Sequence, residues 1–349
     1  MIPEHQTQAF LTGPGSIEIR RLPMPEPGPG ELLIRVDAAT TCGTDVKVYR
    51  RGGHPTMLAL PSPFGHEVTG TVARAAAGAA HTEGDAVVVA NSASCGECQP
   101  CRHKRENLCR NLVYLNGAFA DYLLIPEAVA KRSVHPRPAG LEPVVAAMAE
   151  PLACAVHCLE RCLGAWSGPP TEARTLVIGC GPLGLMLIDL FHSMRTHVRA
   201  LDPHRHRLEA ARSFGAAETR LGRAGEGDGP AAEDSFDFSI DATGTPAGWD
   251  HAVSSLAPGG VAALFGGCRP GTELVIDAER VHYQEQTLLG VYHHRPSSFR
   301  AALDRLCGAP ERYGALVERE LPLDQLTEAL DLMIGRHALK VAIRPHSNE

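Results

Sequence analysis

The sequence predicts an α/β protein with two domains, one mostly β and one built on a doubly wound parallel sheet. Three observations lead to this fold class. The chain has 349 residues, more than a single hydrophobic core usually supports. Its first part shows short runs in which apolar and polar residues alternate, which is typical of strands. After that, short apolar strands alternate with helices, which is typical of a parallel sheet.

The mostly β domain is expected over residues 1–152. Apolar and polar residues alternate through residues 9–40, and the turn-rich segment PMPEPGPGE within them predicts a hairpin. Further strands are predicted at 67–72, 86–90 and 120–125. A cysteine-rich lobe at about 91–112 interrupts this pattern.

The parallel-sheet domain is expected over residues 153–296, and a helical stretch at about 144–163 leads into it. Strand, helix, strand and helix are then predicted at 174–179, 183–194, 197–201 and 207–214, and further strands at 236–240, 260–264 and 287–290. The glycine-rich stretch 222–234 is predicted to be a surface loop. The last segment, 297–349, is expected to be helical and then to return to the first domain through a strand at 339–344.

Four cysteines in the lobe follow the spacing C-x2-C-x2-C-x7-C: Cys95, Cys98, Cys101 and Cys109. Tetrahedral coordination by four thiolates is the usual geometry of a closed, structural zinc site. A disulfide is disfavoured, because cysteines three residues apart rarely reach the required geometry. An iron–sulfur cluster would need a closer last cysteine followed by proline, and Arg110 stands there instead. The lobe is therefore predicted to hold a structural zinc ion.

Composition narrows the setting of the protein. A net charge of −7 offers no basic footprint for nucleic acid and no patch for an anionic membrane. The first residues, MIPEHQTQAF, contain no apolar signal segment, and no later stretch is expected to be long enough to span a bilayer. The 11 cysteines are therefore expected to be thiols and metal ligands in a reducing cytoplasm.

A glycine-rich turn opens the parallel-sheet domain. Gly179, Gly181 and Gly184 form a G-x-G-x-x-G between a predicted strand and a predicted helix. Asp202 ends the next strand, 18 residues past the last glycine. This is the context of a dinucleotide site, in which the glycines permit the tight turn, the approach of the pyrophosphate and close helix packing. The helix N-terminus adds free N–H groups and partial positive charge.

The acidic residue predicts which dinucleotide binds. The Asp202 carboxylate can accept hydrogen bonds from both adenosine ribose hydroxyls and would repel a 2′-phosphate, so NAD is expected rather than NADP. His204, Arg205 and Arg207 follow at once and could pair with a phosphate. Alternatively, Arg207 begins a helix and Arg205 is a solvated surface charge. The predicted cofactor-binding residues are Gly179, Gly181, Pro182, Leu183, Gly184, Asp202 and Arg207.

A second set of potential metal ligands stands in and just after the β-rich part. Cys42 lies in the segment TCGTD, His66 follows 24 residues later in GHE, and Glu150 heads the segment EPL. A lone His–Glu pair is more often a core histidine beside a surface acid. However, this chain combines cysteine, histidine and carboxylate with a four-cysteine lobe and a nucleotide motif. That combination indicates a second metal site.

Together these motifs resemble those of the zinc-dependent medium-chain dehydrogenases, the alcohol, sorbitol and threonine dehydrogenase superfamily. The resemblance spans essentially the whole chain, from CGTD at 42–45 through GHE at 65–67, the cysteine lobe and NGAFADY at 116–122 to the nucleotide motif. The EPL segment, and a carboxylate in place of a further cysteine ligand, are most similar to the polyol (sorbitol/iditol) branch. The resemblance implies a GroES-like catalytic domain, a Rossmann NAD-binding domain and two zinc ions per chain, one catalytic and one structural.

The resemblance also implies roles for individual residues. Cys42 and His66 would bind the catalytic zinc, and Glu67 or Glu150 would complete the set, one directly and the other through water or in alternate states. An open position would receive the substrate hydroxyl, whose pKa the metal lowers. Thr44 would hydrogen-bond the substrate oxygen and pass its proton onward.

Other positions carry weaker implications. Lys47 stands where many relatives have a relay histidine, so it could contact the cofactor or substrate or point into solvent. Tyr49 and Phe119 match positions that line the substrate cleft. His293 and His294 fall where polyol dehydrogenases place an Arg-Tyr pair, although adjacent histidines are often just partly exposed polar residues.

Two further features have plain alternatives. His54 could touch the substrate or be an ordinary loop residue. Cys154, Cys158 and Cys162 recur every four residues and are expected to form a buried stripe of a helix rather than a third metal site.

The sequence therefore predicts an oxidoreductase that transfers a hydride between NAD and a secondary alcohol on a polyol, sugar or cyclitol, with or without an amino group, giving the ketone. L-threonine or a simple secondary alcohol is the alternative substrate on the same fold. A non-catalytic nucleotide-binding protein is the alternative of another class. The resemblance further implies a homodimer or homotetramer.

Overall fold

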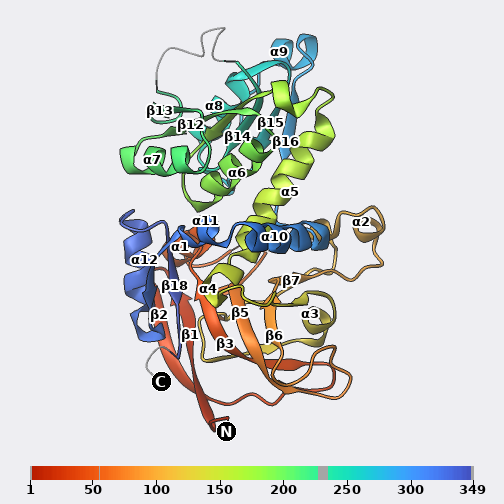
Figure 1. The fold of residues 1–349 in the computed structure, drawn as a ribbon, viewed down its shortest axis with the longest axis vertical. Coiled ribbons are helices and arrows are strands. Elements are labelled where there is room, and N and C mark those ends of the chain that lie inside the picture. The colour runs from red at the N-terminus through yellow and green to blue at the C-terminus, as the bar shows by residue number, and fades with distance from the viewer. Residues whose placement is uncertain (1, 55, 227–234, 347–349) are drawn as a thin grey trace. The chain divides into compact units, whose positions relative to one another are not determined.

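The computed structural model describes residues 2–54, 56–226 and 235–346 (Figure 1). The chain forms two compact units, of which unit 1 comprises residues 1–153 and 295–349 and unit 2 comprises residues 154–294. Unit 1 is rich in strands, and unit 2 holds a parallel sheet with helices. The predicted α/β fold class is thus confirmed.

Unit 1 is built from short strands joined by loops and helices. Its strands are β1 (His5–Gly13), β2 (Ser16–Pro23), β3 (Leu32–Thr40), β4 (Ser62–Pro63), β5 (Glu67–Ala75), β6 (Ala86–Val89), β7 (Ser92–Ala93), β8 (Val113–Tyr114), β9 (Tyr122–Ile125), β10 (Val134–Pro136), β17 (Val317–Leu321) and β18 (Lys340–Ile343). Its helices are α1 (Gly43–Arg51), α2 (Gln99–Arg102), α3 (Glu127–Arg132), α4 (Pro143–Ala146), α10 (Pro296–Gly308), α11 (Pro310–Gly314) and α12 (Leu326–Ile334).

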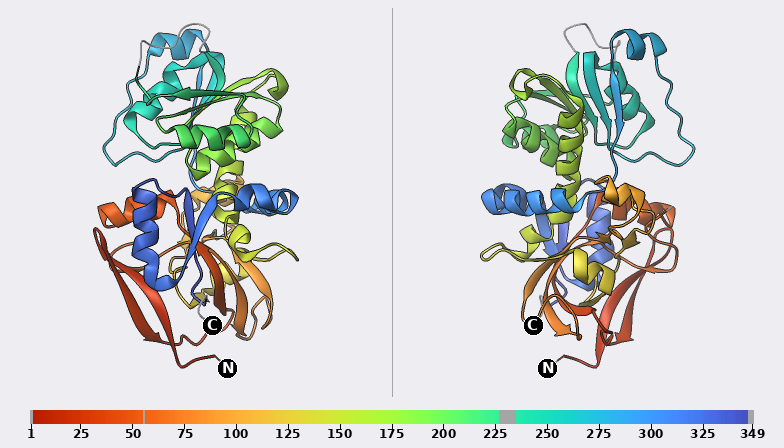
Figure 2. Two further views of the ribbon diagram at one scale, coloured as in Figure 1. Left: turned by 60° about the vertical axis from the view of Figure 1, so that its left-hand side comes forward. Right: turned by 90° about the vertical axis from the view of Figure 1, so that its right-hand side faces the viewer.

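The main sheet of unit 1 joins the two ends of the chain. Its strand order is β10-β6-β5-β3-β18-β17, with β9 also paired to β3, and a smaller sheet has the order β2-β1-β4. The late strand β18 pairs antiparallel with β3, placing Ala342 opposite Thr40. Helix α12 lies beside these strands in both views of Figure 2. The C-terminal segment therefore completes the sheet from which the candidate metal ligands project.

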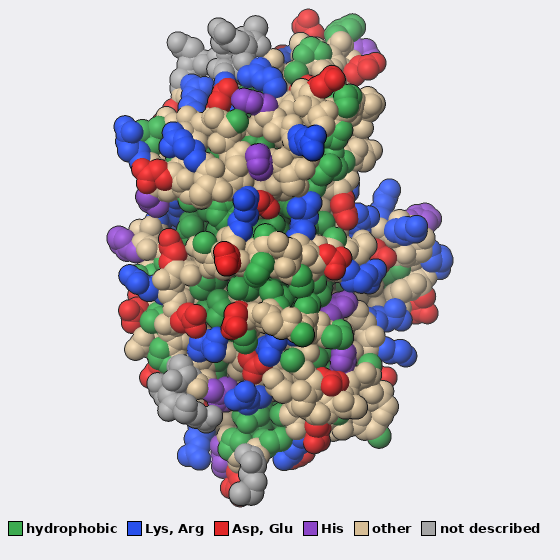
Figure 3. Space-filling view, viewed as in Figure 1, with side chains coloured by type: hydrophobic (Ala, Val, Ile, Leu, Met, Phe, Trp, Pro, Cys, Tyr) green, Lys and Arg blue, Asp and Glu red, His purple; other side chains and the backbone are tan. Residues whose placement is uncertain are grey.

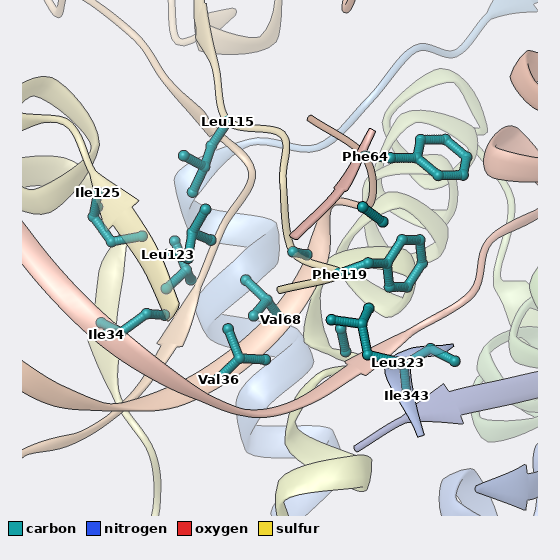
Figure 4. Close-up of a cluster of buried hydrophobic side chains, with 14 of the residues drawn as sticks. Ile34, Val36, Phe64, Val68, Leu115, Phe119, Leu123, Ile125, Leu323 and Ile343 are labelled. Carbon is teal, nitrogen blue, oxygen red and sulfur yellow. The ribbon is translucent and has the colours of Figure 1, made fainter. Parts of the chain in front are cut away.

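The hydrophobic core of unit 1 lies between the strands of these sheets (Figure 4). Ile34 and Val36 on β3 and Val68 on β5 are almost fully buried, as expected for strands whose apolar residues share one face. Phe64 and Phe119 pack edge to face with ring centroids 5.6 Å apart. This core fixes the entry to β5, where the predicted ligands His66 and Glu67 stand.

Unit 2 contains a six-stranded parallel sheet in the order β13-β12-β11-β14-β15-β16. Numbered within the unit this is 3-2-1-4-5-6, the order of dinucleotide-binding folds, with the ligand crevice beside the first strand. The strands are β11 (Arg174–Ile178), β12 (His197–Asp202), β13 (Glu218–Leu221), β14 (Phe236–Asp241), β15 (Leu256–Leu264) and β16 (Thr287–Gly290). The helices are α5 (Ala149–Ala165, which begins in unit 1), α6 (Pro182–Ser193), α7 (Arg205–Ser213), α8 (Pro246–Ser254) and α9 (Ala278–Tyr283).

The structure corrects the predicted hairpin around PMPEPGPGE. The hairpin lies between β1 and β2, where Gly13 pairs with Ser16, whereas β2 and β3 belong to different sheets. The intervening segment contains prolines at 25, 27 and 29, which cannot donate to a ladder, so it crosses from one sheet to the other instead of turning back. The predicted loop at 222–234 lies partly outside the described residues, which stop at 226 and resume at 235.

A second correction concerns the prediction that no stretch of the chain is long enough to span a bilayer. Residues Pro143–Ala165 form a helical stretch that is long and apolar enough, by length and composition, to cross a membrane. However, 78% of its most apolar window is buried inside the structure, as in the core helix of a globular protein.

Lys and Arg side chains are interspersed with Asp and Glu over the face seen in Figure 3.

The close pairing of β5 with β3 makes Gly70 a sensitive position. A Cβ on Gly70 would lie 2.3 Å from the carbonyl oxygen of Arg35, so Gly70→Ala must push two central strands apart. We expect a loss of unfolding free energy of about 2 kcal/mol, measured by urea unfolding. Gly308→Ala is the matched control, because nothing lies within 4 Å of a Cβ there. Equal stability of the two variants would contradict this packing.

Candidate active site and metal centres

The four lobe cysteines gather around α2 as one cluster of sulfur atoms. Four of their sulfur–sulfur distances lie between 3.4 and 4.0 Å. A tetrahedron with zinc–sulfur bonds of about 2.3 Å has edges of about 3.8 Å, so the cluster fits a zinc ion. Backbone N–H groups of Arg110 and Cys101 lower the pKa of the Cys98 thiol to about 6, whereas burial raises the pKa of Cys101 to about 12. Four thiolates leave such an ion no open position for a substrate.

Cys42, His66 and Glu67 form a second group, in which one donor atom from each residue lies within 4.8 Å of the others. All three side chains are buried. Cys42 follows β3 as the N-cap of α1, and His66 and Glu67 stand where β5 begins. Because β3 and β5 are antiparallel neighbours, with Thr40 opposite Glu67, the two segments meet.

Asp45 fixes the histidine of this group. Its Oδ1 lies 3.1 Å from His66 Nδ1, and its Oδ2 accepts a hydrogen bond of 2.9 Å from the backbone N–H of Cys42. Burial by itself lowers the pKa of His66, but the Asp45 carboxylate and the Cys42 thiol outweigh burial and raise it well above its usual value. With Nδ1–H donated to Asp45, Nε2 is the ring nitrogen left for a metal.

Lys340 and Thr40 hold the glutamate. Lys340 Nζ lies 2.6 Å from Glu67 Oε2, and the hydroxyl of Thr40 donates to the same oxygen. Lys340 Nζ also donates to the carbonyl oxygen of Thr41 at 2.7 Å. Lys340 is 1% exposed and Glu67 is 0% exposed. Burial disfavours the Lys340 charge, but Glu67, Cys42 and Asp45 raise its pKa above the usual value.

One oxygen of this buried carboxylate remains open to a metal. Glu67 Oε1 has no hydrogen-bond partner among the described residues, although both of its neighbours bond to Oε2. A buried carboxylate oxygen without a partner is costly unless a cation approaches it. Sulfur, imidazole nitrogen and carboxylate oxygen are all zinc ligands, so these residues fit a catalytic zinc ion.

Two other residues of unit 1 that the sequence singled out are Glu150 and His54. Glu150 is buried at the start of α5 and is not in the group with Cys42, His66 and Glu67. Burial, and then the charge of His66, lower the pKa of His54.

Several residues predicted to act on the substrate lie on or near α1. Thr44 is half-buried, and its backbone N–H donates to Cys42 Sγ at 3.4 Å. Lys47 is half-buried further along the helix, and Tyr49 packs on the core. Phe119 lies within the core at 0% exposure. The roles of Thr44, Lys47, Tyr49 and Phe119 toward a substrate stay predictions.

The predicted residues of unit 2 near its C-terminal end are two adjacent histidines whose rings are tilted relative to each other. The rings of His293 and His294 lie 4.1 Å apart, with His293 at a φ of 60° and half-buried, and His294 buried. Of the three cysteines predicted to form a buried stripe on α5, Cys158 and Cys162 are fully buried, whereas Cys154 is half-buried. A hydrogen bond to Cys162, and then burial, raise the pKa of Cys158, so it behaves as a buried thiol.

The glycine-rich turn has the geometry of a pyrophosphate cradle. Gly179 adopts a φ of 94°, and a Cβ on Gly184 would lie 1.8 Å from the carbonyl oxygen of Gly179. Nothing lies within 4 Å of a Cβ on Gly181, so the chain there is open to a ligand. Pro182 and Leu183 begin α6, whose N-terminus faces this turn. These residues fit a dinucleotide phosphate.

Asp202 ties the end of β12 to this turn. It is 3% exposed, and its two oxygens accept hydrogen bonds of 2.9 Å from the backbone N–H groups of Cys180 and His204. A carboxylate can accept about four hydrogen bonds, so lone pairs remain for ribose hydroxyls. Burial, and then Asp202, raise the pKa of the Cys180 thiol, whereas the nearby Arg207 opposes this rise. Arg207 is half-buried and Arg205 is exposed.

Three residues at the metal group were not singled out from the sequence. Asp45 could have been predicted, because it stands in the CGTD segment three residues after the N-cap Cys42. A capping box pairs the N-cap with an acidic residue at that position. Thr40 and Lys340 carry no such signal. Lys340 stands 273 residues from its partner Glu67, so no local sequence pattern could predict their contact.

Comparison with known proteins agrees with this architecture. Residues 28–136 match the alcohol dehydrogenase GroES-like domain, and residues 144–344 match the glucose dehydrogenase C-terminus. D-altritol 5-dehydrogenase of Agrobacterium fabrum is 32% identical over 89% of this chain and 91% of its own length. An L-threonine 3-dehydrogenase of Thermococcus kodakarensis is 30% identical over 71% of each chain.

A solved structure extends the likeness to the fold. A protein of Sinorhizobium meliloti 1021, provisionally described as a zinc-binding dehydrogenase and bound to NADP, has a TM-score of 0.86 and 26% identity, covering 98% of this chain and 100% of its own. The fold and the two metal-ligand groups thus define a dehydrogenase of the alcohol dehydrogenase type. The chain belongs to the zinc-dependent medium-chain dehydrogenase/reductase superfamily, in the part that contains polyol and threonine dehydrogenases.

Lys340→Met would leave the Glu67 carboxylate buried without its cation. Removing one partner of a buried ion pair typically costs about 3–5 kcal/mol, and we expect a loss of that size in unfolding free energy. Urea unfolding measures the loss, with Lys131→Met as the control, because Lys131 is exposed on α3. Equal stability of both variants would show that Glu67 does not depend on Lys340.

Proposed function

We propose that this protein oxidises a secondary alcohol on a polyol, sugar or cyclitol, with NAD as hydride acceptor and zinc at the Cys42–His66–Glu67 group. The products are the ketone, NADH and a proton. The observation that carries the proposal is this buried group, in which Glu67 Oε1 lacks a partner among the described residues.

One relative supports a polyol as the substrate. The match to D-altritol 5-dehydrogenase covers 89% of this chain, and its name describes polyol oxidation. L-threonine is the second candidate, because several L-threonine 3-dehydrogenases also match, two of them at 30% and 31% identity. A panel of polyols, cyclitols, amino sugars and L-threonine, followed by NADH absorbance, separates the two. No turnover of any member of the panel would count against both.

The residues divide the work as follows. Cys42, His66 and Glu67 hold the zinc, which supplies a Lewis acid that lowers the pKa of the substrate hydroxyl. Asp45 keeps His66 in the tautomer that presents Nε2. Thr44 receives the proton of the substrate hydroxyl and passes it on. Glu150 is the candidate for an alternate ligand.

The cofactor is held by the glycine-rich turn, Pro182, Leu183 and Asp202, with Arg207 beside them. Hydride transfer belongs to the nicotinamide chemistry of the cofactor, and the turn supplies its anchor. Although the Sinorhizobium meliloti structure holds NADP, the buried Asp202 carboxylate of this chain supports NAD, because it would repel a 2′-phosphate.

Cys42→Ala tests the catalytic metal group. We expect turnover to be lost, NADH binding to be kept, and the zinc content to fall from about two ions per chain to one, because the lobe site is separate. Elemental analysis and NADH fluorescence titration measure these quantities. Cys307→Ala, at an exposed cysteine, should change neither. Full turnover in Cys42→Ala would remove Cys42 from the mechanism.

Asp202→Asn tests the cofactor preference. We expect the ratio of kcat/KM for NAD to that for NADP to fall by about tenfold or more, because the charge that repels a 2′-phosphate is lost. The control is Asp250→Asn, at an exposed position on α8. An unchanged ratio would refute the ribose role of Asp202.

We also propose that the protein is a cytoplasmic homo-oligomer acting on a small molecule, with neither nucleic acid nor membrane as a partner. No disulfide joins any of the 11 cysteines, all of which lie in the described part of the chain, and this suits a reducing compartment. Strand β16 is an edge of the six-stranded sheet, and Val275 and Tyr283 in the same unit are 88% and 79% exposed. Edge strands and exposed apolar residues are common features of subunit contacts.

A further inference from the structure

Unit 1 contains a cavity that the proposed reaction does not use. Its volume is about 570 Å³, within the range of small-molecule sites. Residues of β3, β5 and β17 line it, together with residues that follow β10 and β18. Asp37 in its wall precedes Cys42 by five residues of extended chain, which corresponds to about 16 Å. The cavity is therefore separate from the metal group.

The lining holds more arginines than carboxylates. Three arginines, Arg35, Arg137 and Arg344, face two carboxylates, Asp37 and Glu320. The lining thus carries one net positive charge in a chain whose net charge is −7. A positive cavity in an otherwise acidic protein selects for anions.

One arginine is fixed in place for such a ligand. The Arg137 side chain is 15% exposed, and its guanidinium donates to Asp37 Oδ2 at 2.8 Å. Asp37 in turn accepts from Thr71 Oγ1 at 2.9 Å and lies 3.3 Å from Arg35. Asp37 is therefore occupied by three partners and positions the two guanidinium groups rather than repelling an anion.

The other two arginines keep most of their donors available. Arg344 is 35% exposed and meets Glu320 at 3.7 Å, too far for a hydrogen bond. Arg35 is 45% exposed and gives one bond, to Asp37. A guanidinium has five N–H groups, so both can turn donors toward a guest. Such planar forks match the oxygens of phosphate and carboxylate groups.

We propose that this cavity binds a small organic anion that carries a phosphate group or two carboxylates. Arg137 supplies the fixed contact, and Arg35 and Arg344 close on the anion from the two rims. The site is independent of the alcohol and of the cofactor, so it would stand even if the proposed reaction proved wrong.

The test uses the zinc-loaded protein saturated with NADH, which blocks the phosphate cradle of unit 2. Isothermal titration at constant ionic strength employs inorganic phosphate in one arm and glutarate in the other. We expect one saturable site per chain for at least one probe. Arg344→Gln and Arg35→Gln should each weaken that binding by about tenfold, the effect of one lost charged contact.

Arg20→Gln is the matched control, because Arg20 is 36% exposed, pairs with Glu18 on β2 and lies outside the cavity. It should leave the affinity unchanged. Arg344→Gln keeps all three Asp37 contacts, so this variant stays informative if Arg35→Gln fails to fold. Binding of phosphate alone or glutarate alone supports the site and assigns its class. Absence of saturable binding, or equal affinity in all variants, would overturn the proposal.

Discussion

The buried ion pair between Glu67 and Lys340 is the contact on which the metal group depends. Two charges at 0% and 1% exposure are tolerable only when each has a partner, because water is absent. The pair joins β5 to the C-terminal strand β18, and Thr40 of β3 adds a second bond to the same carboxylate oxygen. The last strand must therefore return to the first sheet before Glu67 can turn one oxygen toward a metal.

The two metal-ligand groups show how the type of ligand distinguishes a structural metal site from a catalytic one. The lobe cysteines supply four identical thiolates, which close a tetrahedron and leave no vacancy. The Cys42 group supplies three different donors, each held by a second partner: Asp45 behind His66, Lys340 behind Glu67, and the helix N-terminus beside Cys42. Three protein ligands leave a position for a substrate. The more conspicuous cysteine cluster thus belongs to the less reactive site.

In unit 2, close backbone packing and one carboxylate shape the glycine-rich turn. Gly179 and Gly184 approach so closely that a side chain on the second would meet the carbonyl oxygen of the first. Asp202 then ties the turn to the end of β12 through two backbone N–H groups. The carboxylate that shapes the turn is the one proposed to meet the ribose, so in this proposal local folding and cofactor choice share one residue.

The sequence alone determined the fold class, the four-cysteine lobe, the glycine turn with Asp202, and the candidate ligands Cys42 and His66, because each rests on residues close together in the chain or on motifs in a fixed order. It did not find Lys340 or Thr40, and it misplaced the hairpin at residues 23–31, since strand partners are chosen by burial across the whole domain. Nor could it rank the two glutamates, Glu67 and Glu150. Only the tertiary structure brought Glu67 into the group with Cys42 and His66, because a buried carboxylate needs a cation and the chain supplies that cation 273 residues later.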